Sequence, residues 1–183
     1  MSKIATAHYD GEYTIVLTSD GRVFSFGDCE KGMLGIGSSP TNKCDLKNCQ
    51  AASPSISCNS EPVQLAFPAG AGSIIDIGAG DDFALAADVH GNVYGWGQAN
   101  DGLVGNGCCR GAGCAVCTGG QSTNGGQNYN YYSPVASTEL NVTKLGSRVL
   151  KIHAGSNFVV VQVENGRVYG LGMNNNGQLG TAG

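Results

Sequence analysis

The sequence has no long apolar run and few charged residues. No stretch approaches the roughly 18–20 consecutive apolar residues of a transmembrane helix, so we expect no membrane insertion. Charged residues make up only 13% of the 183 residues, the formal net charge is −4, and no run of Lys or Arg occurs. Because binding to nucleic acids or to anionic membranes needs a basic face, this composition disfavours both. The N-terminal MSKIATAHYD lacks the apolar core of a signal peptide.

Helical periodicity and recognisable catalytic motifs are also absent. Apolar residues do not recur at a 3.6-residue period over any helix-length window. There is no nucleophile motif, phosphate-binding loop or paired-carboxylate pattern. His8, His90 and His153 fall in different parts of the chain, at strand or turn positions. We therefore expect a protein that is not an enzyme and that has no cofactor and no metal. Zinc bound by cysteines is the one alternative, and it is considered below.

The chain is rich in glycine, with 30 residues, and it repeats one phrase three times. Residues 11–37, 80–107 and 155–183 each contain a β-rich run, a two-residue turn and a second β-rich run. The turns are Asp20-Gly21, His90-Gly91 and Asn165-Gly166. Asp-Gly and Asn-Gly favour the type I′ turns that match the twist of β-hairpins. Each phrase therefore predicts a hairpin, followed by a Gly-rich turn.

Further short strands flank these hairpins. KIATAHY, SIIDIGA and VLKIHAG precede them, and EPVQLAF and SPVASTE follow the first two. Consecutive four-stranded units are typical of propeller blades. The sequence therefore predicts an all-β fold of three blades with four antiparallel strands each, in an incomplete ring. We place the blades at residues 1–72, 73–147 and 148–183, with Cys-rich insertions at 38–61 and 106–133, and expect the third blade to lack its last strand.

The repeats resemble those of the regulator of chromosome condensation family. The pattern is a glycine, an aromatic residue, a turn glycine, a Val-aromatic pair with a further glycine, and a Gly-x-[Leu/Val]-Gly segment. The matching residues are Gly11, Tyr13, Gly21, Val23, Phe24, Gly27, Gly32, Leu34 and Gly35; Gly80, Phe83, Gly91, Val93, Tyr94, Gly97, Gly102, Val104 and Gly105; and Gly155, Phe158, Gly166, Val168, Tyr169, Gly172, Gly177, Leu179 and Gly180.

The resemblance implies a propeller fold but leaves the function open. Family propellers usually have seven blades, and members often carry His where this chain has Tyr13, Phe83 and Phe158. The founding member promotes guanine-nucleotide exchange on a small nuclear GTPase, which is one alternative function. A similar propeller occurs in a secreted bacterial inhibitor of β-lactamase, which makes an enzyme inhibitor another alternative.

Eight cysteines form two groups of four, one near or within each insertion. They are Cys29, Cys44, Cys49, Cys58, Cys108, Cys109, Cys114 and Cys117. Disulfides would close these long loops and reduce the entropy of the unfolded chain. Alternatively, the Cys114-x-x-Cys117 pair with Cys108 and Cys109 could bind zinc, or the thiols could be free. Four cysteines in one loop allow three pairings, and the sequence does not choose among them.

Disulfides would place the protein in an oxidising compartment, outside the cell or in the secretory-pathway lumen. The sequon Asn141-Val142-Thr143 makes Asn141 a candidate for glycosylation. The alternative location is cytoplasmic or nuclear.

We expect a non-catalytic interaction or structural module, whose partner is another copy or a different chain that completes the propeller. Self-association could build an extracellular fibre or a larger propeller assembly, and exchange on a small GTPase or enzyme inhibition are the alternatives. The last repeat and a Tyr-rich part of the second insertion supply the interface candidates, because Tyr combines contact area with a hydroxyl group. The candidates are Asn174, Asn175, Asn176, Gln178, Leu179, Tyr129, Tyr131 and Tyr132.

Metal analysis combined with thiol titration of the native protein distinguishes the three states of the cysteines. Disulfides predict neither bound zinc nor reactive thiols, because the sulfur atoms are already paired. Stoichiometric zinc would support the metal site, and thiols that react without denaturant would contradict both the disulfide and the metal interpretation.

Overall fold

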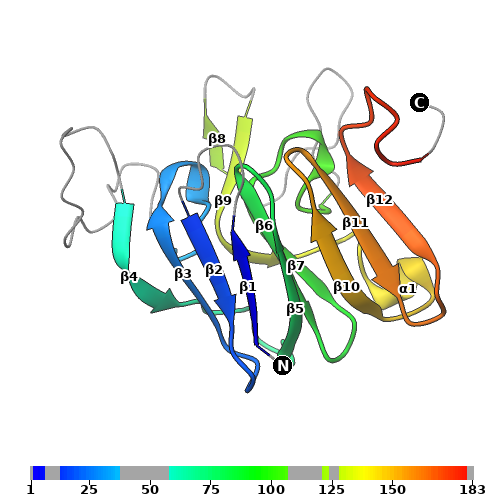
Figure 1. Cartoon of the computed structure of the whole chain (residues 1–183), viewed down its shortest axis with the longest axis horizontal. Coiled ribbons are helices and arrows are strands. Elements are labelled where there is room, and N and C mark those ends of the chain that lie inside the picture. The colour runs from blue at the N-terminus through cyan, green and yellow to red at the C-terminus, as the bar shows by residue number, and fades with distance from the viewer. Residues whose placement is uncertain (1, 7–12, 38–57, 107–120, 124–127, 181–183) are drawn as a thin grey trace.

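Three antiparallel sheets lie side by side in the order of the sequence (Figure 1). This computed structural model describes residues 2–6, 13–37, 58–106, 121–123 and 128–180. Each sheet is one repeat of the sequence, and the innermost strands of the three sheets are neighbours. The predicted all-β architecture of propeller-type blades is confirmed.

The strands follow the chain with few exceptions. The first blade has the order β1-β2-β3-β4, the second β5-β6-β7-β9-β8, and the third β10-β11-β12. The strands are β1 (Lys3–Thr6), β2 (Tyr13–Leu17), β3 (Val23–Asp28), β4 (Cys58–Gln64), β5 (Ile74–Ala79), β6 (Phe83–Asp88), β7 (Val93–Gln98), β8 (Gln121–Thr123), β9 (Asn128–Ala136), β10 (Val149–Ala154), β11 (Phe158–Val163) and β12 (Val168–Gly172). The connections between blades lie at 65–73 and 137–148.

The second blade differs from the sequence-based expectation. We expected its fourth strand to begin at the Ser-Pro-Val segment, but β9 already begins at Asn128. The segment Gln121–Thr123 forms β8, which pairs with the first part of β9 and gives this blade a fifth strand. Alternation of Asn and Tyr in NYNYY suits a strand, because side chains in a strand alternate between its two faces.

The hairpin turns form the lower end of the molecule in Figure 1, which we call the turn end. Their glycines have nearly the same φ, +84° at Gly21, +83° at Gly91 and +85° at Gly166. Only glycine adopts such a conformation without strain. The opposite end carries the Gly-rich segments that follow β3, β7 and β12, and we call it the loop end.

A buried carboxylate supports the turn that contains His90. Asp88 accepts hydrogen bonds from the backbone N–H groups of His90 and Asn92, both at 2.9 Å, and from the Tyr94 hydroxyl at 3.0 Å. Burial alone raises the pKa of Asp88, but hydrogen bonds led by those of the Gly72 and Asn92 backbone outweigh burial and lower this pKa. Burial and the bond to Asp88 raise the pKa of Tyr94 to about 12. These bonds explain how the least typical turn of the three is maintained.

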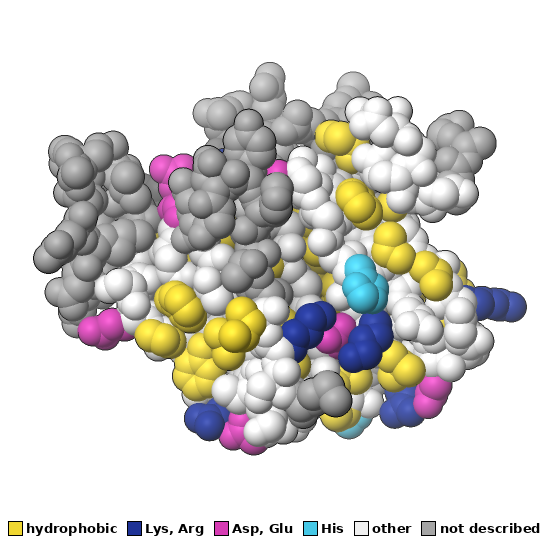
Figure 2. Space-filling view, in the orientation of Figure 1, with side chains coloured by type: hydrophobic (Ala, Val, Ile, Leu, Met, Phe, Trp, Pro, Cys, Tyr) yellow, Lys and Arg dark blue, Asp and Glu magenta, His cyan; other side chains and the backbone are white. Residues whose placement is uncertain are grey.

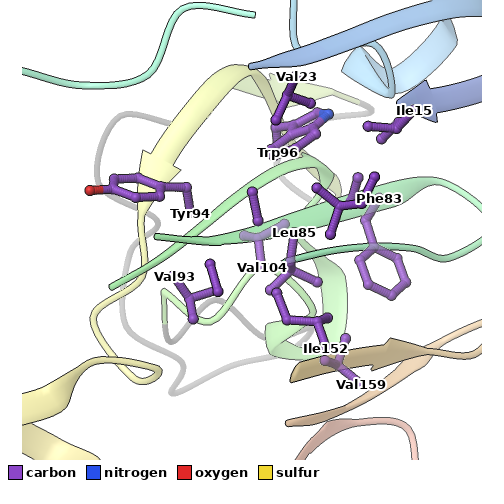
Figure 3. Packing of buried hydrophobic residues seen from close by; sticks show 14 of the residues in the cluster. Ile15, Val23, Phe83, Leu85, Val93, Tyr94, Trp96, Val104, Ile152 and Val159 are labelled. Atoms are coloured by element: carbon purple, nitrogen blue, oxygen red, sulfur yellow. The ribbon is translucent and has the colours of Figure 1, made fainter. Parts of the chain in front are cut away.

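The second blade lies between the other two and supplies the centre of the core. All of β6 is buried, and Trp96 on β7 is fully buried against the first blade. The Trp96 indole Nε1 donates to the Met33 carbonyl oxygen at 2.9 Å. Figure 3 shows Ile15 and Val23 of the first blade beside this group, with Ile152 and Val159 of the third blade on the other side of β6 and β7.

Short turns at the loop end connect each blade to the next. The 3₁₀ turns η1 (Glu30–Gly32) and η2 (Asn100–Gly102) are followed by the buried pairs Met33-Leu34 and Leu103-Val104. Met33 contacts the next blade through Trp96, and Leu103 lies against Gly172. The helix α1 (Val142–Leu145) has only four residues and precedes β10 at the turn end.

Replacing Gly35 with Ala is expected to lower the free energy of unfolding by roughly 2–4 kcal/mol. Gly35 has a φ of +66°, and an added Cβ would lie 2.8 Å from Trp96 Cδ1, so backbone strain and overpacking combine. The matched control is Gly70→Ala, because Gly70 has a φ of +88° and an added Cβ there would meet no atom within 4 Å. That variant should lose only about 1 kcal/mol. Chemical denaturation measures both, and equal losses would contradict a packing role for Gly35.

Candidate interaction surface

The junction between the first and second blades is held by a buried tyrosine. Tyr13, the first residue of β2, is 1% exposed, and its hydroxyl donates to the carbonyl oxygens of Gly80 at 2.8 Å and Phe83 at 2.6 Å. Burial, and then the negative charges of Asp82 and Asp81, raise the pKa of Tyr13 well above its usual value. The hydroxyl therefore stays protonated and continues to donate across the junction.

Polar side chains cover the same junctions at the loop end. Lys31 pairs with Asp82 at 2.6 Å between the first and second blades. Asp81 accepts a hydrogen bond from the Ser156 hydroxyl of the third blade, and its backbone N–H donates to the Ser156 carbonyl at 3.1 Å. Together with the exposed carboxylate of Glu30, these residues give the described part of the loop end an excess of acidic side chains.

The turn end has a different charge pattern, because acids and bases lie there in pairs. Arg22 contacts Asp20 at 2.8 Å, Lys144 contacts Glu139 at 2.6 Å, and Arg148 contacts Glu164 at 2.5 Å. The Glu164 side chain, through its hydrogen bond with Arg148, raises the pKa of Arg148, and the pKa of Glu164 is lowered in turn. The loop end is therefore the more distinctive surface for a charged partner.

A third polar feature lies on the innermost strands, where one carboxylate joins all three blades. Asp76 of β5 is 1% exposed. Its Oδ1 pairs with the Lys3 ammonium of the first blade at 2.9 Å, and its Oδ2 accepts from the Ile152 backbone N–H of the third blade at 2.7 Å. Lys3 also donates to the Ile77 carbonyl at 2.5 Å and to the Ile152 carbonyl at 3.4 Å. Asp76 thus connects blades that are far apart in the sequence.

The strand registers give these charges equivalent positions. In the sheet registers, Lys3 pairs with Leu17, Asp76 with Ala87 and Lys151 with Gln162. These three partners pair in turn with Val23, Val93 and Val168, the valines that lie two residues after each turn glycine. Figure 2 shows Lys or Arg side chains on both sides of an acidic side chain over the inner strands, with a His beside them. The inner surface thus carries a row of alternating charge, defined as Lys3, Asp76 and Lys151.

Comparisons with known proteins agree with this architecture. The regulator of chromosome condensation (RCC1) repeat matches residues 20–87, and a second description of the RCC1 repeat matches residues 74–108. Residues 20–108 therefore carry RCC1-type repeats. The predicted family resemblance is confirmed, whereas its Cys-rich insertions fall largely outside the described residues.

Solved structures of RCC1-type proteins share the fold at low sequence identity. Prp20 from Saccharomyces cerevisiae, studied for its binding to Gsp1p and histones, has a TM-score of 0.71 and 19% identity over 99% of this chain and 35% of its own. Yeast RCC1 (Prp20) bound to Kap60 has a TM-score of 0.67 and 19% identity, over 94% of this chain and 32% of its own. Human WBSCR16 has a TM-score of 0.59 and 21% identity, over 90% of this chain and 32% of its own. The RCC1-repeat chain therefore spans about a third of the length of the structures it matches.

These comparisons correct the predicted location. An extracellular or luminal location is wrong, because the RCC1-like proteins that this chain matches are nuclear or cytoplasmic. The prediction depended on disulfide pairing throughout both insertions. Cys29 is disulfide-bonded, but the other seven cysteine side chains lie outside the described residues, so the pairing scheme and the zinc alternative stay predictions.

The predicted interface residues separate into exposed and structural positions. Asn175 and Asn176 are exposed, whereas Asn174 accepts from the Leu179 backbone N–H at 2.9 Å and Leu179 lies against Gly170 of its own blade. Gln178 is half-buried and binds the Asn176 backbone N–H through its side chain at 2.9 Å. The last repeat therefore uses part of the predicted set to form its own turn.

The Tyr-rich segment is also less available than predicted. Tyr131 is only 2% exposed, so it belongs to the core, and burial raises its pKa. Tyr132 is half-buried, with its carbonyl oxygen accepting from the Gly37 backbone N–H at 2.7 Å, and the side chain of Tyr129 lies outside the described residues. The segment was expected in a loop, but it is part of β9, which pairs with β7, and the backbone of Tyr131 lies close to Gly32 of the first blade.

Asn141 has a structural role that the sequon did not indicate. Its side-chain oxygen accepts from the Lys144 backbone N–H at 3.0 Å, which caps α1, and its side-chain amide donates to the Thr138 carbonyl at 2.8 Å. A glycan would replace one of the two hydrogens on this amide nitrogen and leave one N–H to donate. Glycosylation at Asn141 stays a prediction.

The described residues contain neither a metal site nor a membrane span. No group of three or more His, Cys, Asp or Glu among them is arranged to hold a metal ion. In the same part of the chain, no helix has both the length and the apolar character needed to cross a bilayer.

Replacing Asp76 with Asn is expected to reduce the free energy of unfolding by about 2–3 kcal/mol, because Lys3 loses its charged partner in a partly buried site. Asp20→Asn is the control, since Asp20 also pairs with a cation but is exposed, and it should change stability little. Urea denaturation compares the two. An Asp76 variant as stable as the control would show that the charge contributes nothing to joining the blades.

Proposed function

We propose that this chain is a protein-binding part of an RCC1-type propeller, and that the partner it serves is a small GTPase whose guanine nucleotide it helps to release. The observation that carries the proposal is the match to Prp20 over 99% of the chain with a TM-score of 0.71. Prp20 was studied for its binding to Gsp1p. The proposed activity is one of binding, in which contact with a blade surface stabilises the GTPase without its nucleotide.

The acidic loop end is the surface that we assign to this contact. Among the described residues around the first two junctions, the carboxylates of Glu30, Asp81 and Asp82 outnumber the one cation, Lys31. The turn end carries paired charges and therefore a weaker net field. Electrostatic complementarity mainly accelerates association and selects the partner, so a basic region on the GTPase would dock faster on the loop end.

Nucleotide release from Gsp1p tests the proposal. Gsp1p loaded with a fluorescent guanine nucleotide is mixed with this chain, and the release rate is followed by the loss of fluorescence in the presence of excess unlabelled nucleotide. We expect faster release than the intrinsic rate and direct binding by titration. Binding without faster release would support a protein-interaction role and overturn exchange, and neither effect at any concentration would overturn the whole proposal for this partner.

A matched pair of variants tests the assignment of the surface. Glu30→Lys reverses an exposed charge at the loop end, and Asp20→Lys does the same at the turn end. We expect the first variant to slow association with Gsp1p about tenfold at low salt and the second to leave it nearly unchanged. A larger loss in the Asp20 variant would place the contact at the turn end.

A further inference from the structure

The turn of the third hairpin, between β11 and β12 at the turn end (Figure 1), has the same backbone arrangement as the turn of the first hairpin. Gly21 and Gly166 have φ values of +84° and +85°. The Gly21 N–H donates to the Thr18 carbonyl oxygen at 3.1 Å, and the Gly166 N–H donates to the Val163 carbonyl oxygen at 2.9 Å. The two turns are therefore closed by equivalent hydrogen bonds.

The two turns differ in the partner of the arginine that follows the glycine. In the first hairpin, Arg22 contacts the Asp20 carboxylate at 2.8 Å. The third hairpin has an amide at the equivalent position, Asn165, and the ion pairs among the described residues do not include Arg167. A carboxylate at position 165 would give Arg167 the partner that Arg22 already has.

The third turn also has more room than the other two. An added Cβ at Gly21 would lie 2.8 Å from Ser73 Cβ, and one at Gly91 would lie 2.6 Å from Arg148 Cα. At Gly166 an added Cβ would meet no described atom within 4 Å, and residues 164–168 are all exposed. Water therefore reaches the Asn165-Gly166 peptide, and this turn is free to change its conformation without displacing a neighbouring blade.

A hydrogen bond holds the Asn165 side chain in an orientation that favours attack by the next backbone nitrogen. Asn165 Oδ1 accepts from the Arg167 N–H at 3.1 Å, which closes an Asx turn around the Gly166 peptide. This ring keeps the side-chain carbonyl carbon beside the Gly166 nitrogen, and the Arg167 N–H stabilises negative charge that develops on Oδ1. Glycine is also the least hindered attacking residue, because it has no side chain.

We propose that Asn165 is a modification site at which the amide is lost by spontaneous deamidation, with water as the co-reactant. The Gly166 nitrogen gives its proton to hydroxide and forms a bond to Asn165 Cγ. The bond from Cγ to the side-chain nitrogen then breaks, and ammonia leaves after taking a proton from water. Water opens the resulting cyclic imide at either of its carbonyl groups, which gives aspartate or isoaspartate at position 165. No atom is oxidised or reduced.

The two products have different consequences for the hairpin. Aspartate keeps the length of the backbone and places a carboxylate where Arg167 can bind it, as Arg22 Nε binds Asp20 in the first hairpin. Isoaspartate routes the backbone through the side chain and lengthens it by a carbon atom, which disrupts the bond from the Gly166 N–H to Val163. Both products add negative charge to the turn end, so the inference is independent of the proposed exchange activity at the loop end.

Asn176-Gly177 is a matched comparison within the same chain. Both residues are exposed, an added Cβ at Gly177 would meet no described atom within 4 Å, and the Gly177 N–H donates to the Asn174 carbonyl oxygen at 3.1 Å. Among the described residues, the bond at this turn goes from the Asn176 backbone N–H to Gln178, and none reaches the Asn176 side chain. The Asx turn is thus the feature that distinguishes Asn165.

Peptide mapping by mass spectrometry tests the proposal. The purified chain is kept in mildly alkaline buffer at physiological temperature, and the peptides that contain Asn165 and Asn176 are followed over time. We expect Asn165 to convert about fivefold faster than Asn176, which is the effect of one hydrogen bond on a rate. In concentrated urea the two rates should become similar, because unfolding removes the Asx turn. The proposal is overturned if Asn165 converts no faster than Asn176 in the native protein, or if urea leaves its lead unchanged.

Two variants identify the product and its effect on the fold. Asn165→Gln should suppress conversion at this position, because attack on the longer side chain forms a larger and less favoured ring. Asn165→Asp should give a peptide that co-elutes with the aspartate product, and its melting temperature should match that of the wild type because the first hairpin already contains this arrangement. Equal conversion in the Asn165→Gln variant would contradict the cyclic intermediate, and a markedly lower melting temperature of the Asn165→Asp variant would contradict the equivalence of the two turns.

Discussion

The buried carboxylate of Asp76 is the contact on which the arrangement of the three blades depends. Each blade is a separate sheet, and in the described part of the chain neighbouring blades are joined by side chains, short turns and single backbone bonds such as that from the Ile74 N–H to the Gly21 carbonyl. Asp76 receives an ammonium group from the preceding blade and a backbone N–H from the following one. Because both partners are fixed by strand register, a shift of either neighbouring blade would leave a buried charge without its partners.

Apolar packing supplies the remaining support in an uneven pattern. The second blade is buried on both faces, whereas the first and third each have one covered face and one face that no described residue covers. Trp96 closes the first junction and the turn that carries Leu103 reaches across the second. In repeat proteins stability is approximately a sum of repeat and neighbour terms, so the described part of this propeller is expected to be firmest at its middle blade.

The sequence predicted the blades well because their signals are local. A glycine with positive φ two residues before Val23, Val93 and Val168 determines each hairpin, and alternating apolar residues determine its faces. The role of Asp76 was not predicted, since a single aspartate in a strand looks ordinary until Lys3 and Ile152 are brought beside it by tertiary packing. Aligning Lys3, Asp76 and Lys151 across the repeats would have indicated it. The predicted location was wrong because it was inferred from the cysteine count, whereas the RCC1-like proteins that the chain matches are nuclear or cytoplasmic.

The single tryptophan has a practical consequence for studying this protein. Trp96 is the only Trp in the chain, it is fully buried, and its indole N–H is bonded to the first blade. Its intrinsic fluorescence therefore reports one place, the junction between the first and second blades. A red shift in its emission would signal water entering that junction, while opening of the third blade alone would leave the spectrum largely unaltered. The fold thus contains an intrinsic fluorescent probe at a defined position, the junction between the first and second blades.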